Sequence, residues 1–123
     1  MHNRIFVYGT LKRGNRIRGM DQMGNAKFVN EAVTVDAAFS LYNLGSFPAV
    51  SRKGNNRIQG EIWEVDNDMM EVLDCIEGYP DFYNRCEVVT TEGKAWMYHI
   101  DNVEEECNCT QIKGSKEKTL AWQ

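Results

Sequence analysis

Long apolar runs are absent from this 123-residue sequence. The apolar stretch nearest the N-terminus, Ile5–Tyr8, stops at Gly9 and is about half as long as the apolar segment of a secretory signal peptide. No segment approaches the roughly 18 apolar residues that a membrane-spanning helix requires. We therefore expect a cytoplasmic protein that has no membrane partner.

A recognisable zinc site is also absent, because the spacing of the four cysteines matches no standard pattern. Two of the four cysteines form the sequence Cys107-Asn108-Cys109, with His99 upstream but without the second pair that zinc sites use. Because no secretory signal is apparent, reduced thiols are a better interpretation than disulfides. We expect free thiols and no bound metal.

An excess of basic residues is also missing, since 18 acidic and 14 basic residues give a net charge of −4. A general nucleic-acid-binding protein normally has a basic face, so this balance argues against nucleic acid as a partner. The chain also lacks a P-loop sequence and an obvious Ser-His-Asp or Cys-His set. A module that binds an anion or a nucleotide remains a weaker alternative, because one loop carries Lys12, Arg13, Arg16 and Arg18.

What the sequence does contain predicts one α+β domain over residues 1–123. Segments rich in β-branched and aromatic residues predict about six strands in a curled sheet. A turn is expected at residues 53–56, and residues 101–123 are expected to form a loosely attached polar tail. The strands are placed at residues 4–8, 57–65, 82–90 and 94–100, with one or two more between residues 27 and 44.

One clear helix is predicted by the sequence DNDMMEVLDCIEG, residues 66–78. Asp66 or Asn67 is suited to cap its N-terminus, and Gly78 is suited to end it in a left-handed conformation. Apolar residues recur at helical spacing and predict a buried stripe, formed by Met69, Val72, Leu73 and Ile76.

The segment after the first strand is a candidate binding loop. A strand that ends in Gly9-Thr10 presents consecutive backbone N–H groups at a bend, and such bends bind carboxylates or oxyanions. A plain glycine turn is the more frequent explanation of these residues when they are taken alone. Both interpretations stay open at this point.

Glu77 is a candidate acid–base residue because it ends the helix, where the helix dipole disfavours negative charge. The dipole and burial beside Ile76 and Tyr79 would both favour the neutral acid, which general acid–base chemistry uses. A solvated glutamate before a glycine cap is the simpler explanation of this local pattern.

Aromatic and basic residues near the helix end are further candidates. Tyr79, Tyr83 and Tyr98 could donate phenolic hydrogen bonds in a pocket, although such residues more often belong to the core. Arg85 could bind a substrate carboxylate, pair with an acid, or lie on the surface.

Four segments, in this order along the chain, resemble the γ-glutamylcyclotransferase-like (AIG2-like) family, and the γ-glutamylamine cyclotransferase branch is the closest in style. The resemblance covers about residues 4–100, and its segments are Tyr8-Gly9-Thr10-Leu11, Gly60–Trp63, residues 73–85 and Ala95–His99. It implies a small mixed β-barrel with flanking helices.

The resemblance also implies an enzyme that needs no cofactor and converts a γ-glutamyl amide or amine into 5-oxoproline and a free amine. By match, Glu77 would be the catalytic acid and base. The segment Tyr8 to Leu11 would bind substrate through backbone amides, and Tyr83, Arg85 and Tyr98 complete the set of expected substrate-binding residues.

The sequence departs from the family pattern in two places. One is Asn15-Arg16-Ile17-Arg18, directly after the loop, and the other is the C-terminal tail. Both departures concern the choice of substrate. The main alternative to an enzyme is a non-catalytic family member that binds a small ligand or a protein partner. We expect a monomer, because no strongly apolar surface stripe remains after the core is assigned.

Overall fold

The computed structural model describes residues 3–9, 26–44, 48–101, 110–112 and 119–121. This part of the chain holds one helix and eight strands, which confirms the α+β prediction. In chain order the elements are β1 (Asn3–Val7), β2 (Ala26–Val33), β3 (Phe39–Asn43), β4 (Pro48–Val65), α1 (Asn67–Glu77), β5 (Asn84–Thr90), β6 (Gly93–His99), β7 (Thr110–Ile112) and β8 (Thr119–Leu120).

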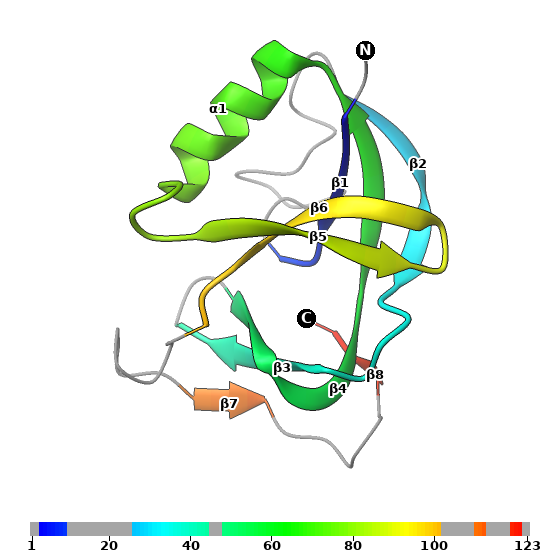
Figure 1. Cartoon of the computed structure of the whole chain (residues 1–123), viewed down its shortest axis with the longest axis vertical. Coiled ribbons are helices and arrows are strands. Elements are labelled where there is room, and N and C mark those ends of the chain that lie inside the picture. The colour runs from blue at the N-terminus through cyan, green and yellow to red at the C-terminus, as the bar shows by residue number, and fades with distance from the viewer. Residues whose placement is uncertain (1–2, 10–25, 45–47, 102–109, 113–118, 122–123) are drawn as a thin grey trace.

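Strand β4 organises the sheet. Its C-terminal half pairs antiparallel with β1 on one edge and with β2 on the other, and its N-terminal half pairs antiparallel with β3. In Figure 1, β4 runs from the end of the molecule that holds β3 and β7 to the end where α1 begins. The strand order β5-β6-β1-β4-β3-β7 does not return on itself within the described residues. An isolated antiparallel bridge joins Thr34, directly after β2, to Thr90 of β5. The sheet therefore curls toward a barrel, and no continuous ladder closes it within the described residues.

The turn expected at residues 53–56 lies inside β4 as an irregularity in its pairing with β3. Phe39 pairs with Asn56, but the next residue, Ser40, pairs with Ser51. A Cβ atom at Gly54 would lie 2.3 Å from the carbonyl oxygen of Phe39, so glycine is required there. The sequence signal was real, but it marked a bulge in one long strand instead of a boundary between two strands.

Two short segments of the expected loose tail are paired with the sheet. Strand β7 lies antiparallel to β3, and β8 lies parallel to β4, with Leu120 opposite Ile58. The Leu120 side chain is 5% exposed and belongs to a buried apolar cluster. Strands of two or three residues in polar surroundings show no readable alternation, so their sequence did not reveal them.

Helix α1 begins and ends as predicted. The Asp66 side chain accepts a hydrogen bond from the Met69 backbone N–H at 2.8 Å, and Gly78 ends the helix with a φ of 68°. Met69 and Leu73 are buried, but the prediction for Val72 was wrong: its side chain is 48% exposed. No helix in the described part of the chain is both long and apolar enough to cross a membrane.

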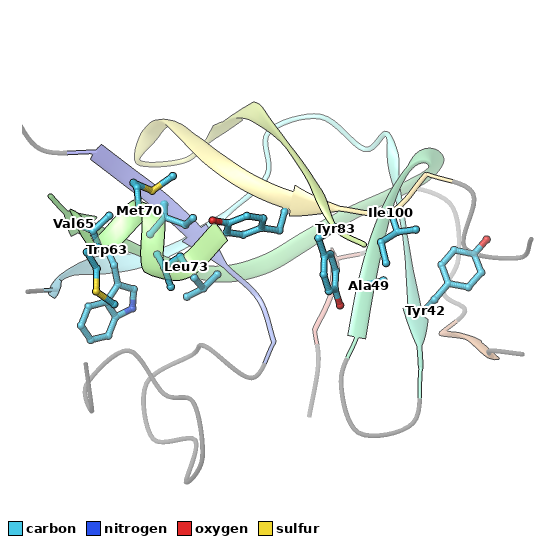
Figure 2. Packing of buried hydrophobic residues seen from close by; sticks show 12 residues of the cluster. Tyr42, Ala49, Trp63, Val65, Met70, Leu73, Tyr83 and Ile100 are labelled. Carbon is cyan, nitrogen blue, oxygen red and sulfur yellow. The ribbon is translucent and has the colours of Figure 1, made fainter. Parts of the chain in front are cut away.

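The core contains two clusters, because neighbouring residues of β1 are buried on opposite faces. Ile5 and Val7 belong to one cluster, and Phe6 and Tyr8 belong to the other. Figure 2 shows the first cluster, which extends from side chains beside α1 along the sheet to β3 and β4. This cluster packs α1 against the sheet through Met69, Met70 and Leu73.

Candidate active site

The candidate residues come from the end of β1, the end of α1 and the β5–β6 hairpin. Tyr8 and Gly9 directly follow β1, and Glu77 is the last residue of α1. The other two residues of the expected loop, Thr10 and Leu11, lie outside the described residues. The proposed role of the loop therefore depends on Tyr8 and Gly9 alone at this stage.

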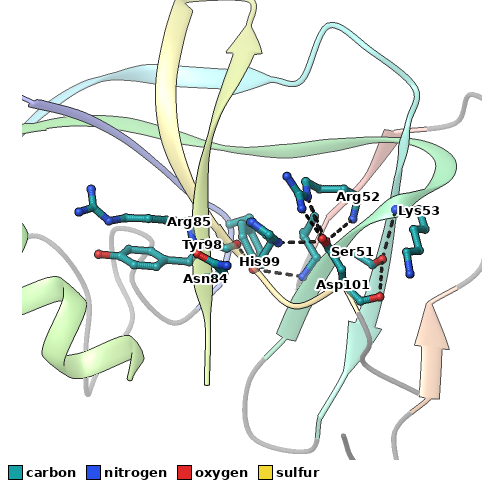
Figure 3. Close-up of polar contacts among 10 residues, drawn as sticks. Ser51, Arg52, Lys53, Asn84, Arg85, Tyr98, His99 and Asp101 are labelled. Atoms are coloured by element: carbon teal, nitrogen blue, oxygen red, sulfur yellow. Dashed lines mark hydrogen bonds and ion pairs between the residues drawn. The ribbon is translucent and has the colours of Figure 1, made fainter. Parts of the chain in front are cut away.

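Strand β6 places the hairpin residues next to β1, because it pairs parallel with β1 and antiparallel with β5. Arg85 on β5 lies opposite Tyr98 on β6. Figure 3 shows their side chains extending side by side toward the side of the sheet that carries α1. Tyr83 directly precedes β5 and is buried.

The Tyr8 hydroxyl joins three strands. It donates a hydrogen bond to the Tyr98 carbonyl at 2.8 Å and accepts one from the Val50 backbone N–H at 3.1 Å. Burial is the main cause that raises the pKa of Tyr8 well above its ordinary value, followed by the neighbouring Tyr83 and Glu77. Glu77 therefore lies close enough to the end of β1 for its charge to act on this hydroxyl.

Tyr98 lies between the hairpin and α1. Its hydroxyl donates a hydrogen bond to Asp74 Oδ1 at 2.6 Å. Burial, the hydrogen bond to Asp74, and the charges of Asp74 and Glu77 raise the pKa of Tyr98, and the charge of Arg85 opposes them. The phenol is therefore protonated near neutral pH and serves as a hydrogen-bond donor.

Arg85 is held by an acid and two aromatic rings. Its Nε lies 3.2 Å from Asp74 Oδ1, and this contact is an ion pair whose geometry is not that of a hydrogen bond. Its guanidinium carbon lies 4.7 Å from the ring centre of Tyr79 and 4.9 Å from that of Trp96. Contacts of this kind orient the planar guanidinium group.

Pro48, the first residue of β4, contacts two of the candidate residues. The Tyr83 hydroxyl donates a hydrogen bond to the Pro48 carbonyl. A Cβ atom at Gly9 would lie 2.6 Å from Pro48 Cγ, so packing within the protein already requires glycine at this position. Pro48 thus gives a reason for glycine at this position that does not depend on a ligand.

Glu77 is partly buried at the end of α1. Its backbone carbonyl accepts a hydrogen bond from the Tyr83 N–H at 3.2 Å, which returns the chain toward β5 directly after the helix. This hydrogen bond places Glu77 beside Tyr83, and the charge of Glu77 raises the pKa of Tyr8 and Tyr98.

Sequence reasoning missed Asp74, Trp96 and Pro48 as partners of these residues. Asp74 precedes Glu77 by one helical turn, so helical spacing alone could have placed the two acids on one face. Trp96 could have been found because it lies two residues before Tyr98 and so shares its face of β6. For Pro48 the sequence carries no local signal.

A second polar network lies beyond the end of β6, and Figure 3 shows it around Asp101. The Asp101 carboxylate accepts hydrogen bonds from the side chain and the backbone N–H of Arg52, and it lies 2.9 Å from His99 Nδ1. Burial lowers the pKa of His99, although Asp101 opposes this effect. The network fastens the segment after β6 to β4.

The cysteines for which the structure gives a state, Cys75 and Cys86, are free thiols, which confirms the prediction for these two. Cys107 and Cys109 lie outside the described residues. Among the residues that the structure describes, no three or more His, Cys, Asp or Glu side chains are grouped as a metal site would require.

Comparisons with known proteins give a family match over most of the chain. The family described as gamma-glutamyl cyclotransferase, AIG2-like, matches residues 5–119. The gamma-glutamylcyclotransferase family protein YtfP of Escherichia coli is 36% identical over 97 residues, which cover 77% of this chain and 80% of that protein.

Solved structures show the same fold. An AIG2-like protein of Mus musculus has 31% sequence identity and a TM-score of 0.69, and the match covers 80% of this chain and 77% of that one. An uncharacterized protein of Pyrococcus horikoshii has 30% identity and a TM-score of 0.71, with 90% of this chain and 86% of that one covered.

Proposed function

This chain belongs to the gamma-glutamyl cyclotransferase, AIG2-like family, and from that premise we propose that it converts a γ-glutamyl amide into 5-oxoproline and a free amine. Membership supports γ-glutamylcyclotransferase activity in general, and the assignment of Glu77 as acid and base is our own. The observation that carries it is the place of Glu77 at the end of α1, where its carbonyl accepts a hydrogen bond from the Tyr83 N–H and its charge raises the pKa of Tyr8 and Tyr98.

The substrate carries its own nucleophile, the α-amine of the γ-glutamyl group, which is protonated near neutral pH. Glu77 accepts one proton from this ammonium group and passes it to solvent, and the neutral amine attacks the γ-carbonyl carbon to form the five-membered ring. Glu77 then accepts a second proton from the ring nitrogen of the tetrahedral intermediate and donates it to the leaving nitrogen as the C–N bond breaks. Because the attack is intramolecular, holding the folded substrate geometry supplies much of the rate enhancement.

Proton transfer is assigned to Glu77 and not to Asp74, the other acid on this face of α1. Asp74 accepts the Tyr98 hydrogen bond and is paired with Arg85. The carboxylate of Asp74 is thus already engaged within the protein, and we assign proton transfer to Glu77.

The other residues hold and surround the substrate. Backbone N–H groups from Gly9 to Leu11 are proposed to bind the α-carboxylate or the developing oxyanion. The hydroxyl protons of Tyr8, Tyr83 and Tyr98 are all donated to acceptors within the protein. We therefore assign the three tyrosines to the walls of the site.

The test is the release of 5-oxoproline from a panel of γ-glutamyl compounds by the wild type and by Glu77→Gln. We expect the variant to lose about 10²- to 10⁴-fold in turnover, because glutamine cannot accept the proton. Glu71→Gln, at an exposed position of the same helix, is the matched control and should retain wild-type turnover.

Circular dichroism and thermal melts establish that both variants are folded. A folded Glu77→Gln variant with near-wild-type turnover would reject the acid–base role. A wild type that binds γ-glutamyl compounds without releasing 5-oxoproline would instead be the non-catalytic family member.

A further inference from the structure

Glu61 is a buried acid that the proposed reaction does not use. It is 7% exposed and lies in the C-terminal half of β4. Its Oε1 accepts a hydrogen bond from Trp63 Nε1–H at 3.1 Å, so the two side chains lie on the same face of the strand. Trp63 belongs to the core cluster that packs against α1. Glu61 therefore faces the side of the sheet that carries the candidate active site.

The pairing of β4 with β1 places Glu61 at the end of β1. Glu61 lies opposite Val7, the last residue of β1. The two backbones approach closely here, because a Cβ atom at Gly60 would lie 2.4 Å from the Val7 carbonyl oxygen. On its other edge β1 pairs parallel with β6, in a register that brings Tyr98 beside Val7. Since neighbouring strands lie about 4.8 Å apart, roughly 10 Å separates the backbones of Glu61 and Tyr98.

The acids of α1 that belong to the candidate site lie on the other side of β1. The sheet places β1 between β6 and β4. Asp74 accepts the hydrogen bond of the Tyr98 hydroxyl on β6. The Glu77 carbonyl accepts a hydrogen bond from the N–H of Tyr83, which directly precedes β5. Both acids are thus connected to the β5–β6 hairpin, whereas Glu61 belongs to β4, and the end of β1 lies between them.

The proposed reaction brings a positive charge to the end of β1. The α-carboxylate of the γ-glutamyl group is assigned to the backbone N–H groups that begin at Gly9, and the α-ammonium group is attached to the same carbon atom. An ammonium group has three N–H donors, and transfer of one proton to Glu77 involves one of them. Glu61 supplies a second carboxylate, on the β4 side of this group.

A buried carboxylate is well suited to bind an ammonium group. It has about four acceptor positions, and the hydrogen bond from Trp63 orients Glu61 through one of them. Opposite charges attract each other more strongly in a buried site than at the surface. Hydrogen bonds to ionised groups are also roughly twice as strong as those between neutral groups.

We propose that Glu61 is a specificity-determining residue whose carboxylate binds the α-ammonium group of the γ-glutamyl substrate. The site then selects compounds that carry the free α-amine and rejects the corresponding glutaryl amides, which lack the nucleophile for ring closure. This inference rests on the proposed function, and the experiment below separates the two.

The test uses γ-glutamyl-methylamide and glutaric acid monomethylamide, which differ only in the α-ammonium group. Calorimetry measures the ratio of their affinities in Glu77→Gln, where turnover is slow and the charge of Glu77 is gone, and again after Glu61→Gln is added. Glutamine keeps the size of Glu61 and can accept the hydrogen bond from Trp63. Glu64→Gln is the control, because it removes the same charge from the opposite face of β4.

We expect Glu77→Gln to bind γ-glutamyl-methylamide more tightly than the glutaryl compound. Adding Glu61→Gln should remove about 10- to 100-fold of this preference, and adding Glu64→Gln should leave it unchanged. Equal affinities before Glu61 is changed, or an unchanged ratio in the folded Glu61→Gln variant, would overturn the inference.

Circular dichroism establishes whether the Glu61→Gln variant is folded. If it is not, Glu61→Asp takes its place, because aspartate keeps the charge but withdraws it by one methylene group. This variant should lose about 3- to 10-fold of the preference, since the attraction weakens with distance. An unchanged ratio in Glu61→Asp would then contradict the inference.

Release of 5-oxoproline by the wild type tests the proposed function separately. If the wild type releases none but the affinity ratio collapses with Glu61→Gln, the proposed reaction fails and the ammonium site stands. If 5-oxoproline is released and the ratio does not change, the reaction stands and the ammonium site fails. If neither compound binds, the ammonium site fails as well.

Discussion

At Gly9 the backbone passes so close to Pro48 that no side chain fits between them. A Cβ atom there would lie 2.6 Å from Pro48 Cγ and 2.8 Å from Pro48 Cδ. This contact joins the end of β1 to the first residue of β4. A substitution at Gly9 therefore changes stability even if the position never meets a ligand.

Gly9→Ala should lower the free energy of unfolding by about 1–3 kcal/mol, the usual cost of overpacking. Removal of the opposing ring should relieve the clash, so the double variant Gly9→Ala/Pro48→Ala should be more stable than the sum of the single variants predicts. Chemical denaturation of the wild type, both single variants and the double variant completes the cycle. If the changes in free energy of unfolding of the two single variants simply add in the double variant, the two residues do not compete for space.

The role of a single residue could be predicted where that role depends only on its neighbours in the sequence. Asp66 and Gly78 act at the ends of α1, and their roles follow from a few neighbouring residues. The partners of Arg85 could not be read in this way, because Asp74 and Trp96 reach it from a helix and another strand. For the same reason the sequence suggested Glu77, Tyr8 and Tyr98 as separate candidates but could not show that the charge of Glu77 acts on the two tyrosines.

At the scale of elements, the Asp101 network attaches the segment after β6 to β4. Burial would raise the pKa of Asp101, but hydrogen bonds from Arg52 and the charges of His99 and Arg52 outweigh it and lower the pKa from 3.8 to about 2. The contribution of this carboxylate to stability is therefore fully present above pH 3.8 and is lost as the pH falls through about 2.

Asp101→Asn should lower the free energy of unfolding by about 1 kcal/mol at pH 7, since its partner Arg52 is largely exposed. The difference from the wild type should shrink as the pH falls from about 4 to 2. Denaturant titrations at several pH values measure this trend, with Asp36→Asn at an exposed position as the control. A difference that is constant down to pH 2 would contradict the ion-pair explanation.

The pairing of elements was harder to predict than the elements themselves. The alternation in residues 57–65 indicated a strand, and the structure places it within β4. The sequence also marked residues 53–56 as irregular, but it could not show that β4 continues through them. That continuity depends on β3, whose register changes between Phe39 and Ser40 to bypass the bulge.

At the scale of the whole molecule, the polar C-terminal segment contributes to the core through β8. Leu120→Ala should lower the free energy of unfolding by about 2 kcal/mol or more, because it leaves a cavity beside buried residues of β4. Thr119→Ala, at an exposed position of the same strand, should change stability by less than about 0.5 kcal/mol. Thermal melts compare the two, and equal small effects would show that β8 does not support the fold.

The fold class followed from composition and strand patterning, but the closure of the sheet did not. A strand order is set by contacts between distant segments, and the parallel pairing of β1 with β6 joins Ile5 to Trp96. No local pattern reports on such a contact, so the sequence could not show how far the sheet closes into a barrel.

The two hydrogen bonds of the Tyr8 hydroxyl also join segments that the ribosome makes at different times. This hydroxyl bonds to Val50 and to Tyr98, which are 42 and 90 residues further along the chain. A ribosome that adds about 5–20 residues per second needs roughly 5 to 18 s to make the chain between Tyr8 and Tyr98. During the later part of that time β4 has been made but β6 has not, so the edge of β1 that pairs with β6 is open to other nascent chains or to chaperones.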